Sequence, residues 1–228
     1  MGQALQQAVE LILSGNDTLL QIISVTLRMS LTSSLVTLIL GVPLGAVLAN
    51  SKSLFGRVII VLNRTMMGLP PVVCGLLCYL MFSGVGPLRH MHLLYTVEGM
   101  VIAQVILITP MVAGNIESFA RTVVEPVNET ARGLGLSRVR CASLVIGECR
   151  YQIISTYILA LGRALAEVGA VSMVGGAIAY KTNIMTTAIM MYTNRGDFKL
   201  AIALGIILVT MFLVMNIVVH IIQTRVSK

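Results

Sequence analysis

Long apolar runs without charge alternate with short polar segments along this chain. Residues 29–51, 65–88, 99–116 and 200–224 contain no Lys, Arg, Asp or Glu, and residues 151–180 contain only Arg163 and Glu167. Each run is close to the roughly 20 residues that a helix needs to cross about 30 Å of hydrocarbon. We therefore predict an all-α polytopic membrane protein with about five transmembrane helices, near residues 19–49, 65–85, 97–118, 152–172 and 199–222.

Composition supports a membrane protein. Of the 228 residues, 57% are hydrophobic and 11% are charged, whereas soluble domains carry about 25% charged residues. In a membrane protein, the net charge of +7 is explained by positive residues that set its orientation in the membrane. No nucleic-acid partner is therefore expected. No internal repeat is visible, so an inverted-repeat transporter is not supported.

The positive charges predict the orientation. With five spans and the N-terminus outside, the three inside segments hold ten Lys and Arg residues and the outside segments hold four. Because positive charge is retained on the cytoplasmic side, we expect the N-terminus outside, the C-terminus inside and a multi-pass location in the plasma membrane. Residues 121–150 then form a cytoplasmic loop.

Proline and glycine mark where helices break. Leu54–Met67 is predicted to be a basic, partly apolar helix that approaches the second span, and Pro70–Pro71 cannot sit inside an unbroken helix. In the loop, Thr122 and Glu125 match a capping box, and Pro126 suits the first turn of a new helix. Gly133 and Gly135 would end that helix, and Ser137 would cap the next one. The loop is therefore predicted to be a helix–turn–helix along the membrane surface.

Two charges fall inside the fourth span. Arg163 and Glu167 are four residues apart and could pair on one helix face. One interpretation is an ion pair that packs the span against its neighbours, and another is a role at a dimer interface. In the third, they line or gate a pathway, with Arg163 offering a bidentate fork to an oxyanion.

The sequence gives little support for metal binding or catalysis. The fourteen methionines are scattered, and His90 and His92 lack a third ligand, so we predict no metal site. There is no nucleophile–base pairing and no phosphate-cradling glycine loop of the Walker type, so we predict no catalytic residues. Thr182, Thr186 and Thr187, in the outer excursion, could face an arriving anion or a binding protein.

Three motifs resemble one family. Glu129–Thr130–Ala131–x–x–x–Gly135 resembles the E-A-A-x-x-x-G loop of ABC importer permeases, with Thr130 in place of the second Ala and no Leu-Pro at the expected later position. Residues 70–75, PPVVCG, resemble the P-P-x-V-x-G span of molybdate, sulfate and tungstate permeases, and residues 162–170, GRALAEVGA, are similar to their G-R-A-x-x-E-x-G-A segment. The tail of the chain, with its V-G-G and T-T-A-I runs, resembles the tungstate-type branch.

The resemblance implies a single permease domain over residues 1–228 with a type I ABC importer fold. It implies an ATP-driven importer for tungstate, with a molybdate or sulfate importer as the alternative, in which a separate cytoplasmic ATPase binds the ATP and this chain holds no cofactor. The ATPase would engage Glu129, Thr130, Ala131, Gly133 and Gly135. An extracytoplasmic oxyanion-binding protein would deliver the substrate to a homodimer in the bilayer. Arg163, Glu167, Pro70 and Pro71 are the pathway or gate candidates.

A stand-alone secondary transporter is the rival from another class. It would work without an ATPase and would need intramembrane charges arranged for ion coupling. Arg163 and Glu167, in the fourth span, are the charges available for that role, which argues against it. A receptor or scaffold would not need the broken helix at Pro70–Pro71.

Overall fold

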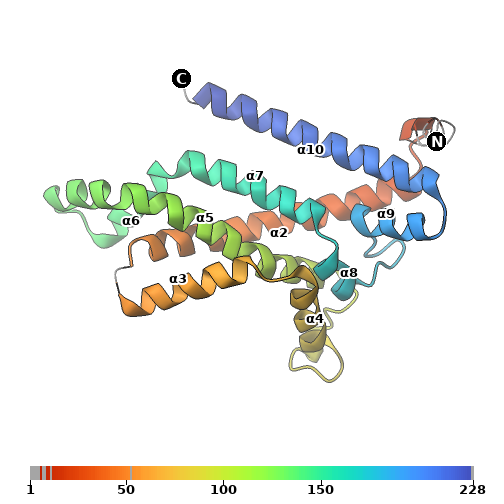
Figure 1. Cartoon of the computed structure of the whole chain (residues 1–228), viewed down its shortest axis with the longest axis horizontal. Coiled ribbons are helices and arrows are strands. Elements are labelled where there is room, and N and C mark those ends of the chain that lie inside the picture. The colour runs from red at the N-terminus through yellow and green to blue at the C-terminus, as the bar shows by residue number, and fades with distance from the viewer. Residues whose placement is uncertain (1–5, 7–8, 11, 52, 227–228) are drawn as a thin grey trace. The chain divides into compact units, whose positions relative to one another are not determined.

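The computed structural model describes residues 6, 9, 10, 12–51 and 53–226, and every regular element in this part of the chain is helical (Figure 1). The elements are α2 (Asp17–Ala49), α3 (Leu54–Met67), α4 (Pro71–Phe82), the 3-10 turn η1 (Arg89–Met91), α5 (Val97–Gly133), α6 (Arg138–Glu148), α7 (Arg150–Ala166), α8 (Gly169–Gly175), α9 (Met185–Asn194) and α10 (Phe198–Val226).

Long apolar helices account for the predicted spans. Within the described residues, α2, α5 and α10 each contain a segment long and apolar enough to cross a membrane. Two bent pairs, α3 with α4 and α7 with α8, raise the number to as many as five if each pair forms one span. The prediction of an all-α protein with about five spans is confirmed at this level.

One compact unit comprises residues 1–32, 71–104 and 162–228. In it α9 packs against α10, around a buried cluster that includes Leu19, Met185 and Leu204. A hydrogen bond fixes the start of α9, because the Met185 N–H donates to Thr26 Oγ1 on α2 at 2.9 Å. The apolar side chains thus hold this unit together, and a buried hydroxyl sets the position of a helix start.

The contact between α4 and α8 in the same unit is very close (Figure 1). A Cβ atom added to Gly75 would lie 2.7 Å from the Ala170 Cα and 3.1 Å from its carbonyl oxygen. Small residues let helix backbones approach in membranes. Gly75 and Ala170 therefore determine how these two short helices pack.

The second unit comprises residues 33–70 and 105–161. Its core joins Ala49, Ala120, Val124, Val145 and Cys149, which are all at most 6% exposed. These residues come from α2, α5, α6 and the α6–α7 junction, so the loop region predicted at 121–150 is packed against the end of the first long helix.

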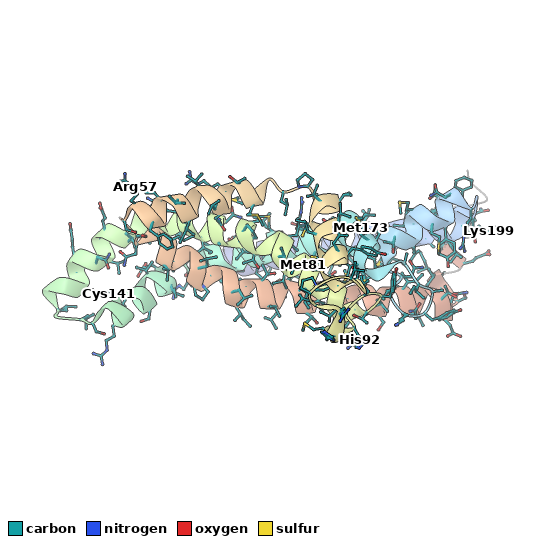
Figure 2. The ribbon with its side chains drawn as sticks, turned by 90° about the horizontal axis from the view of Figure 1, so that it is seen from below. Arg57, Met81, His92, Cys141, Met173 and Lys199 are labelled. Atoms are coloured by element: carbon teal, nitrogen blue, oxygen red, sulfur yellow. The ribbon has the colours of Figure 1, made fainter. Side chains whose placement is uncertain are left out.

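Many apolar side chains are exposed on the protein surface. On α3, where Figure 2 labels Arg57, they include Phe55 and Val61, which are 74% and 63% exposed. Exposed Leu, Ile and Val side chains also run along α10. Surfaces of this kind suit a lipid environment, in which lipid tails replace water as the solvent.

Candidate functional site

The C-terminal end of α5 carries the segment predicted to couple to a partner. The expected capping box is not formed, because α5 continues without interruption through Pro126 to Gly133. The Thr122 hydroxyl instead donates to the Phe119 carbonyl at 2.7 Å. Burial explains the continuity: Ala120, Val124 and Ala131 are at most 5% exposed, and this packing outweighs the local signals for a helix start.

The end of the helix is where the glycines predicted it. Gly135 has φ +67°, and the Leu136 N–H donates across it to the Ala131 carbonyl at 2.9 Å. This is the hydrogen bond of a Schellman helix end, in which a residue in the left-handed conformation satisfies a terminal carbonyl. Ser137 is then the N-cap of α6, without a side-chain hydrogen bond. The helix–turn–helix is therefore present, although its first helix is the extension of α5.

The predicted coupling residues differ in exposure. Ala131 is fully buried, whereas Glu129, Thr130 and Gly133 are exposed. The Thr130 hydroxyl donates to the Pro126 carbonyl at 3.0 Å, one helical turn earlier. Thr130 can therefore replace the Ala of the family motif without leaving its hydroxyl unpaired, because the polar group is satisfied on its own helix.

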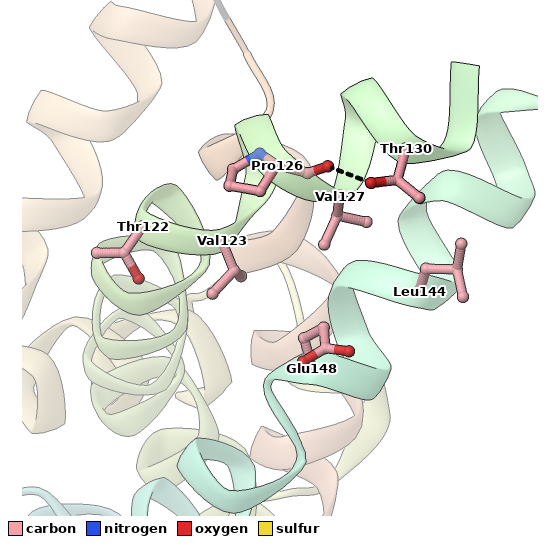
Figure 3. Close-up of a pocket in the computed structure, with 7 residues that line it drawn as sticks. All are labelled: Thr122, Val123, Pro126, Val127, Thr130, Leu144 and Glu148. Atoms are coloured by element: carbon pink, nitrogen blue, oxygen red, sulfur yellow. Dashed lines mark hydrogen bonds between the residues drawn. The ribbon is translucent and has the colours of Figure 1, made fainter. Parts of the chain in front are cut away.

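A cleft of about 410 Å³ lies between the end of α5 and α6 (Figure 3). It is lined by Thr122, Val123, Pro126, Val127, Thr130, Leu144 and Glu148. The walls are mostly apolar, and Glu148 contributes a carboxylate. Next to it, burial raises the pKa of the Cys149 thiol above its ordinary value, with a smaller contribution from Glu148. Cys149 is therefore a protonated packing residue at neutral pH.

The predicted fourth span is broken where it was expected to be continuous. Helix α7 ends at Ala166 and α8 begins at Gly169. Three polar side chains satisfy backbone groups that the break frees. Gln104 Nε2 donates to the Ala164 carbonyl at 2.7 Å, the Ala170 N–H donates to Glu167 Oε1 at 3.2 Å, and Thr186 Oγ1 donates to the Glu167 carbonyl at 2.8 Å.

These bonds explain why a helix can break here. Non-helical backbone at membrane depth is tolerated where it is buried in protein or lines a cavity. Glu167 is 5% exposed and Gln104 is fully buried, so the break is stabilised by groups inside the protein.

A second cleft, of about 330 Å³, lies at this break. It is lined by Pro71, Val72, Arg163, Ala166, Glu167, Val168 and Gly169. Three of the four pathway candidates are therefore brought together, and Pro70 is not among the lining residues. The cleft also adjoins the start of α4, because a Cβ atom added to Gly169 would lie 3.2 Å from the Val72 nitrogen.

Arg163 and Glu167 do not form the ion pair that their spacing suggested. Ion pairs between residues that the structure describes include Arg28–Glu98, Arg64–Glu117 and Arg121–Glu117. Because α7 ends at Ala166, Glu167 no longer follows the helical spacing, and its carboxylate accepts from the first turn of α8 instead. Arg163 is exposed at the cleft.

The outer threonines also differ from expectation. Thr182 and Thr187 are each 1% exposed. The Thr182 hydroxyl donates to the Gly175 carbonyl at 2.6 Å, and the Thr187 hydroxyl lies 2.9 Å from Asn183 Oδ1. Thr186 is 9% exposed, and its hydroxyl donates to the Glu167 carbonyl at the break between α7 and α8. These side chains hold the connection between α8 and α9 together, and all three are buried rather than exposed to an anion or a binding protein.

The sequence reasoning missed Glu117, which is 2% exposed in α5. Its carboxylate accepts from Arg121 on the same helix and from Arg64 on α3. The spacing from Glu117 to Arg121, four residues with Glu first, was the available signal. The ion pair with Arg64 joins residues that are 53 positions apart in the sequence, so no local pattern could predict it.

Known proteins resemble the chain over most of its length. The family model described as "Binding-protein-dependent transport system inner membrane component" matches residues 41–228. The chain is 31% identical over 227 residues to the tungstate uptake system permease protein TupB of Peptoclostridium acidaminophilum, covering 98% of both chains. It is 34% identical over 164 residues to TupB of Campylobacter jejuni, covering 72% of this chain and 69% of that protein.

A solved structure has the same fold. It is the crystal structure of a bacterial ABC transporter involved in the import of the acidic polysaccharide alginate, with a TM-score of 0.75 and 18% identity. The match covers 98% of this chain and 84% of that chain. With the family model and the relatives, it confirms the predicted resemblance to ABC importer permeases. The chain belongs to the family of binding-protein-dependent transport system inner membrane components.

Proposed function

We propose that this chain is the permease subunit of an ATP-driven importer of tungstate. The observation that carries the proposal is the 31% identity to a tungstate uptake permease over 98% of both chains. The molybdate and sulfate alternatives remain open, because a relative at 29% identity is named for molybdate and tungstate transport and one at 24% for sulfate. As a permease subunit, the chain is a transport component, and ATP hydrolysis belongs to its ATPase partner.

The proposed assembly is a homodimer with the N-termini outside and the C-termini inside. A cytoplasmic ATPase binds each permease chain, and an extracytoplasmic binding protein delivers the oxyanion. The positive charges support this orientation, since ten of the fourteen Lys and Arg residues assigned to the two sides fall on the predicted inner side. In this arrangement the end of α5 and the whole of α6 are cytoplasmic.

The ATPase is proposed to bind at Glu129–Gly135 and the neighbouring α5–α6 cleft. Support comes from the exposure of Glu129 and Thr130 beside an open cleft with apolar walls. Because α5 is one helix from Val97 to Gly133, a displacement of its cytoplasmic end would move the whole helix. Closure of the ATPases would thus move the spans as packed bodies.

The cleft at the break between α7 and α8 is the proposed part of the tungstate pathway, lined by Arg163, Glu167 and Pro71, and Pro70, next to Pro71, is a further gate candidate. Arg163 is an exposed residue that lines this cleft, and its guanidinium can present a planar pair of donors to an oxyanion. The Glu167 carboxylate is held by the Ala170 N–H, and its negative charge would limit how tightly an anion is retained. Weak retention favours release during transport.

The proposed substrate can be tested with the full complex in proteoliposomes that contain ATP. The binding protein is added with tungstate, molybdate, sulfate or phosphate, and both ATP hydrolysis and uptake are measured. We expect tungstate to stimulate both activities at the lowest concentration. Uptake of sulfate or phosphate, with no response to tungstate or molybdate, would contradict the proposal.

Replacing Arg163 tests the pathway. Loss of a hydrogen bond to a charged group costs about 1.5–3 kcal/mol, so we expect Arg163→Met to reduce tungstate uptake about tenfold or more. Arg163→Lys should be intermediate, because it keeps the charge and loses the planar fork. The control is Arg28→Met, since the Arg28 side chain is 71% exposed and pairs with Glu98. Equal uptake by the Arg163→Met and Arg28→Met variants would exclude Arg163 from the pathway.

A further inference from the structure

A buried carboxylate connects two helices in the unit formed by residues 33–70 and 105–161. The Glu117 side chain on α5 is 2% exposed, whereas its partners Arg64 and Arg121 are 60% and 44% exposed. Arg64 Nη2 lies 3.4 Å from Glu117 Oε2, and Arg121 Nε donates to Glu117 Oε1. Each carboxylate oxygen thus has its own arginine partner, one on α3 and one on α5.

Burial of the carboxylate distinguishes the Arg64–Glu117 ion pair from the Arg28–Glu98 ion pair, which has the same N–O distance. Arg28 and Glu98 also lie 3.4 Å apart, but their side chains are 71% and 62% exposed. An exposed pair is weakened by water and salt, and it usually contributes little. A buried carboxylate that loses a partner is left partly uncompensated, which is far more costly. The position of α3 beside Glu117 is therefore constrained in a way that an exposed pair does not achieve.

A second polar contact fixes the same two helices. Asn63 Nδ2 on α3 donates to the Pro110 carbonyl on α5 at 3.0 Å. Asn63 and Arg64 are adjacent residues near the C-terminal end of α3, which ends at Met67, just before the break at Pro70–Pro71. On α5, the same helix that carries Glu117 ends in the segment Glu129–Gly135. The contacts thus join the helix that leads into the break to the helix that bears the proposed ATPase contact.

We infer that Glu117 is a positioning residue that transmits movement from the ATPase-binding end of α5 to the last turn of α3, and so to the Pro70–Pro71 break. The inference rests on the proposed function, because the movement originates at the ATPase. Glu117 touches neither substrate nor ATP in this scheme. It makes α3 follow α5, so that the break at the start of α4 responds when the cytoplasmic end of α5 is displaced.

The two arginines provide an internally matched test. Arg64→Met and Arg121→Met each leave Glu117 with one arginine, but only Arg64→Met cuts the ionic link between the helices. The readout is the number of ATP molecules hydrolysed per tungstate taken up by the reconstituted complex. We expect this ratio to rise about tenfold in Arg64→Met, within the usual range of coupling effects, and to stay within about twofold of wild type in Arg121→Met. Arg64→Lys, which keeps the charge, should restore most of the coupling.

Two controls separate coupling from stability. Glu98→Gln removes the exposed ion pair and should leave the ratio unchanged, and thermal unfolding of each purified complex reports structural damage. Equal ratios in the Arg64→Met and Arg121→Met variants would overturn the inference. Failure of the Arg64→Met complex to assemble would also overturn it, because the link would then serve folding. A wild-type complex without tungstate-stimulated hydrolysis would instead refute the proposed function itself.

Discussion

Replacing Gly135 with valine is expected to abolish tungstate uptake while leaving the permease in the membrane. Gly135 has φ +67°, a conformation that a β-branched residue adopts only at a cost of about 1–3 kcal/mol. An added Cβ atom at this position would meet no atom within 4 Å, so the strain is confined to the backbone. The helix end would then change its direction to relieve it, and the Leu136–Ala131 hydrogen bond would be lost.

The consequence concerns the ATPase contact. Gly135 follows the exposed Glu129 and Thr130 by about one and a half turns, and it sets how the chain passes from α5 to α6. A misdirected helix end cannot present both helices to one partner surface. We expect co-purification of the ATPase subunit to fall by at least about tenfold, which corresponds to about 1.4 kcal/mol of binding energy.

A matched control exists within the chain. Gly196 has φ +75° and also no atom within 4 Å of an added Cβ, and it precedes α10, away from the segment Glu129–Gly135 in the sequence. Gly196→Val therefore imposes the same kind of backbone strain without touching the proposed contact. Uptake and ATPase co-purification should stay near wild type in this variant. If the Gly135→Val variant retained both, the segment would not be the coupling site.

Local signals were sufficient where one residue type determines the backbone. The run from Leu54 to Met67 has the predicted bounds, because Ser53 Oγ accepts from the Gly56 N–H at its start and Pro70–Pro71 follows its end. Gly135 was predicted to lie at a helix end, and it occupies the left-handed position there. Such features depend on neighbours within a few residues, so they can be read from the sequence.

Contacts between residues far apart in the sequence determine the course of α5 and the break between α7 and α8. Helix α5 passes through Pro126 because Val124 and Ala131 are buried against other helices. The fourth span breaks at Glu167 because Gln104 and Thr186, 60 and 19 residues away from their partners, satisfy its freed carbonyls. Gln104 belongs to none of the quoted motifs, and the T-T-A-I run that contains Thr186 does not by itself indicate a contact with Glu167. Arg163, Glu167 and Pro71 line one cleft, whereas the ion pair that the spacing of Arg163 and Glu167 suggested is not formed.

Replacing Gly75 with leucine is expected to disrupt the protein beside the proposed pathway. An added Cβ atom would lie 2.7 Å from the Ala170 Cα and 3.2 Å from the Met173 Cβ. Rotation of a side chain cannot relieve a clash with a backbone atom, so α4 and α8 must separate. Overpacking of this kind costs about 1–3 kcal/mol or more. The melting temperature of the purified complex should fall by about 5 °C, and uptake should fall with it, because Val72 and Gly169 line the cleft next to this contact.

Two further variants make this prediction specific. Gly205→Leu, in α10, is the control, since an added Cβ atom there would meet nothing within 4 Å, and its melting temperature should stay near that of wild type. The double variant Gly75→Leu with Ala170→Gly should not recover, because the nearest atoms are the Cα and carbonyl oxygen of residue 170, which glycine retains. Recovery in the double variant would mean that the Ala170 methyl group, and not its backbone, sets the distance between the helices. The claim that the backbone of residue 170 sets the distance between α4 and α8 beside the cleft would then be wrong.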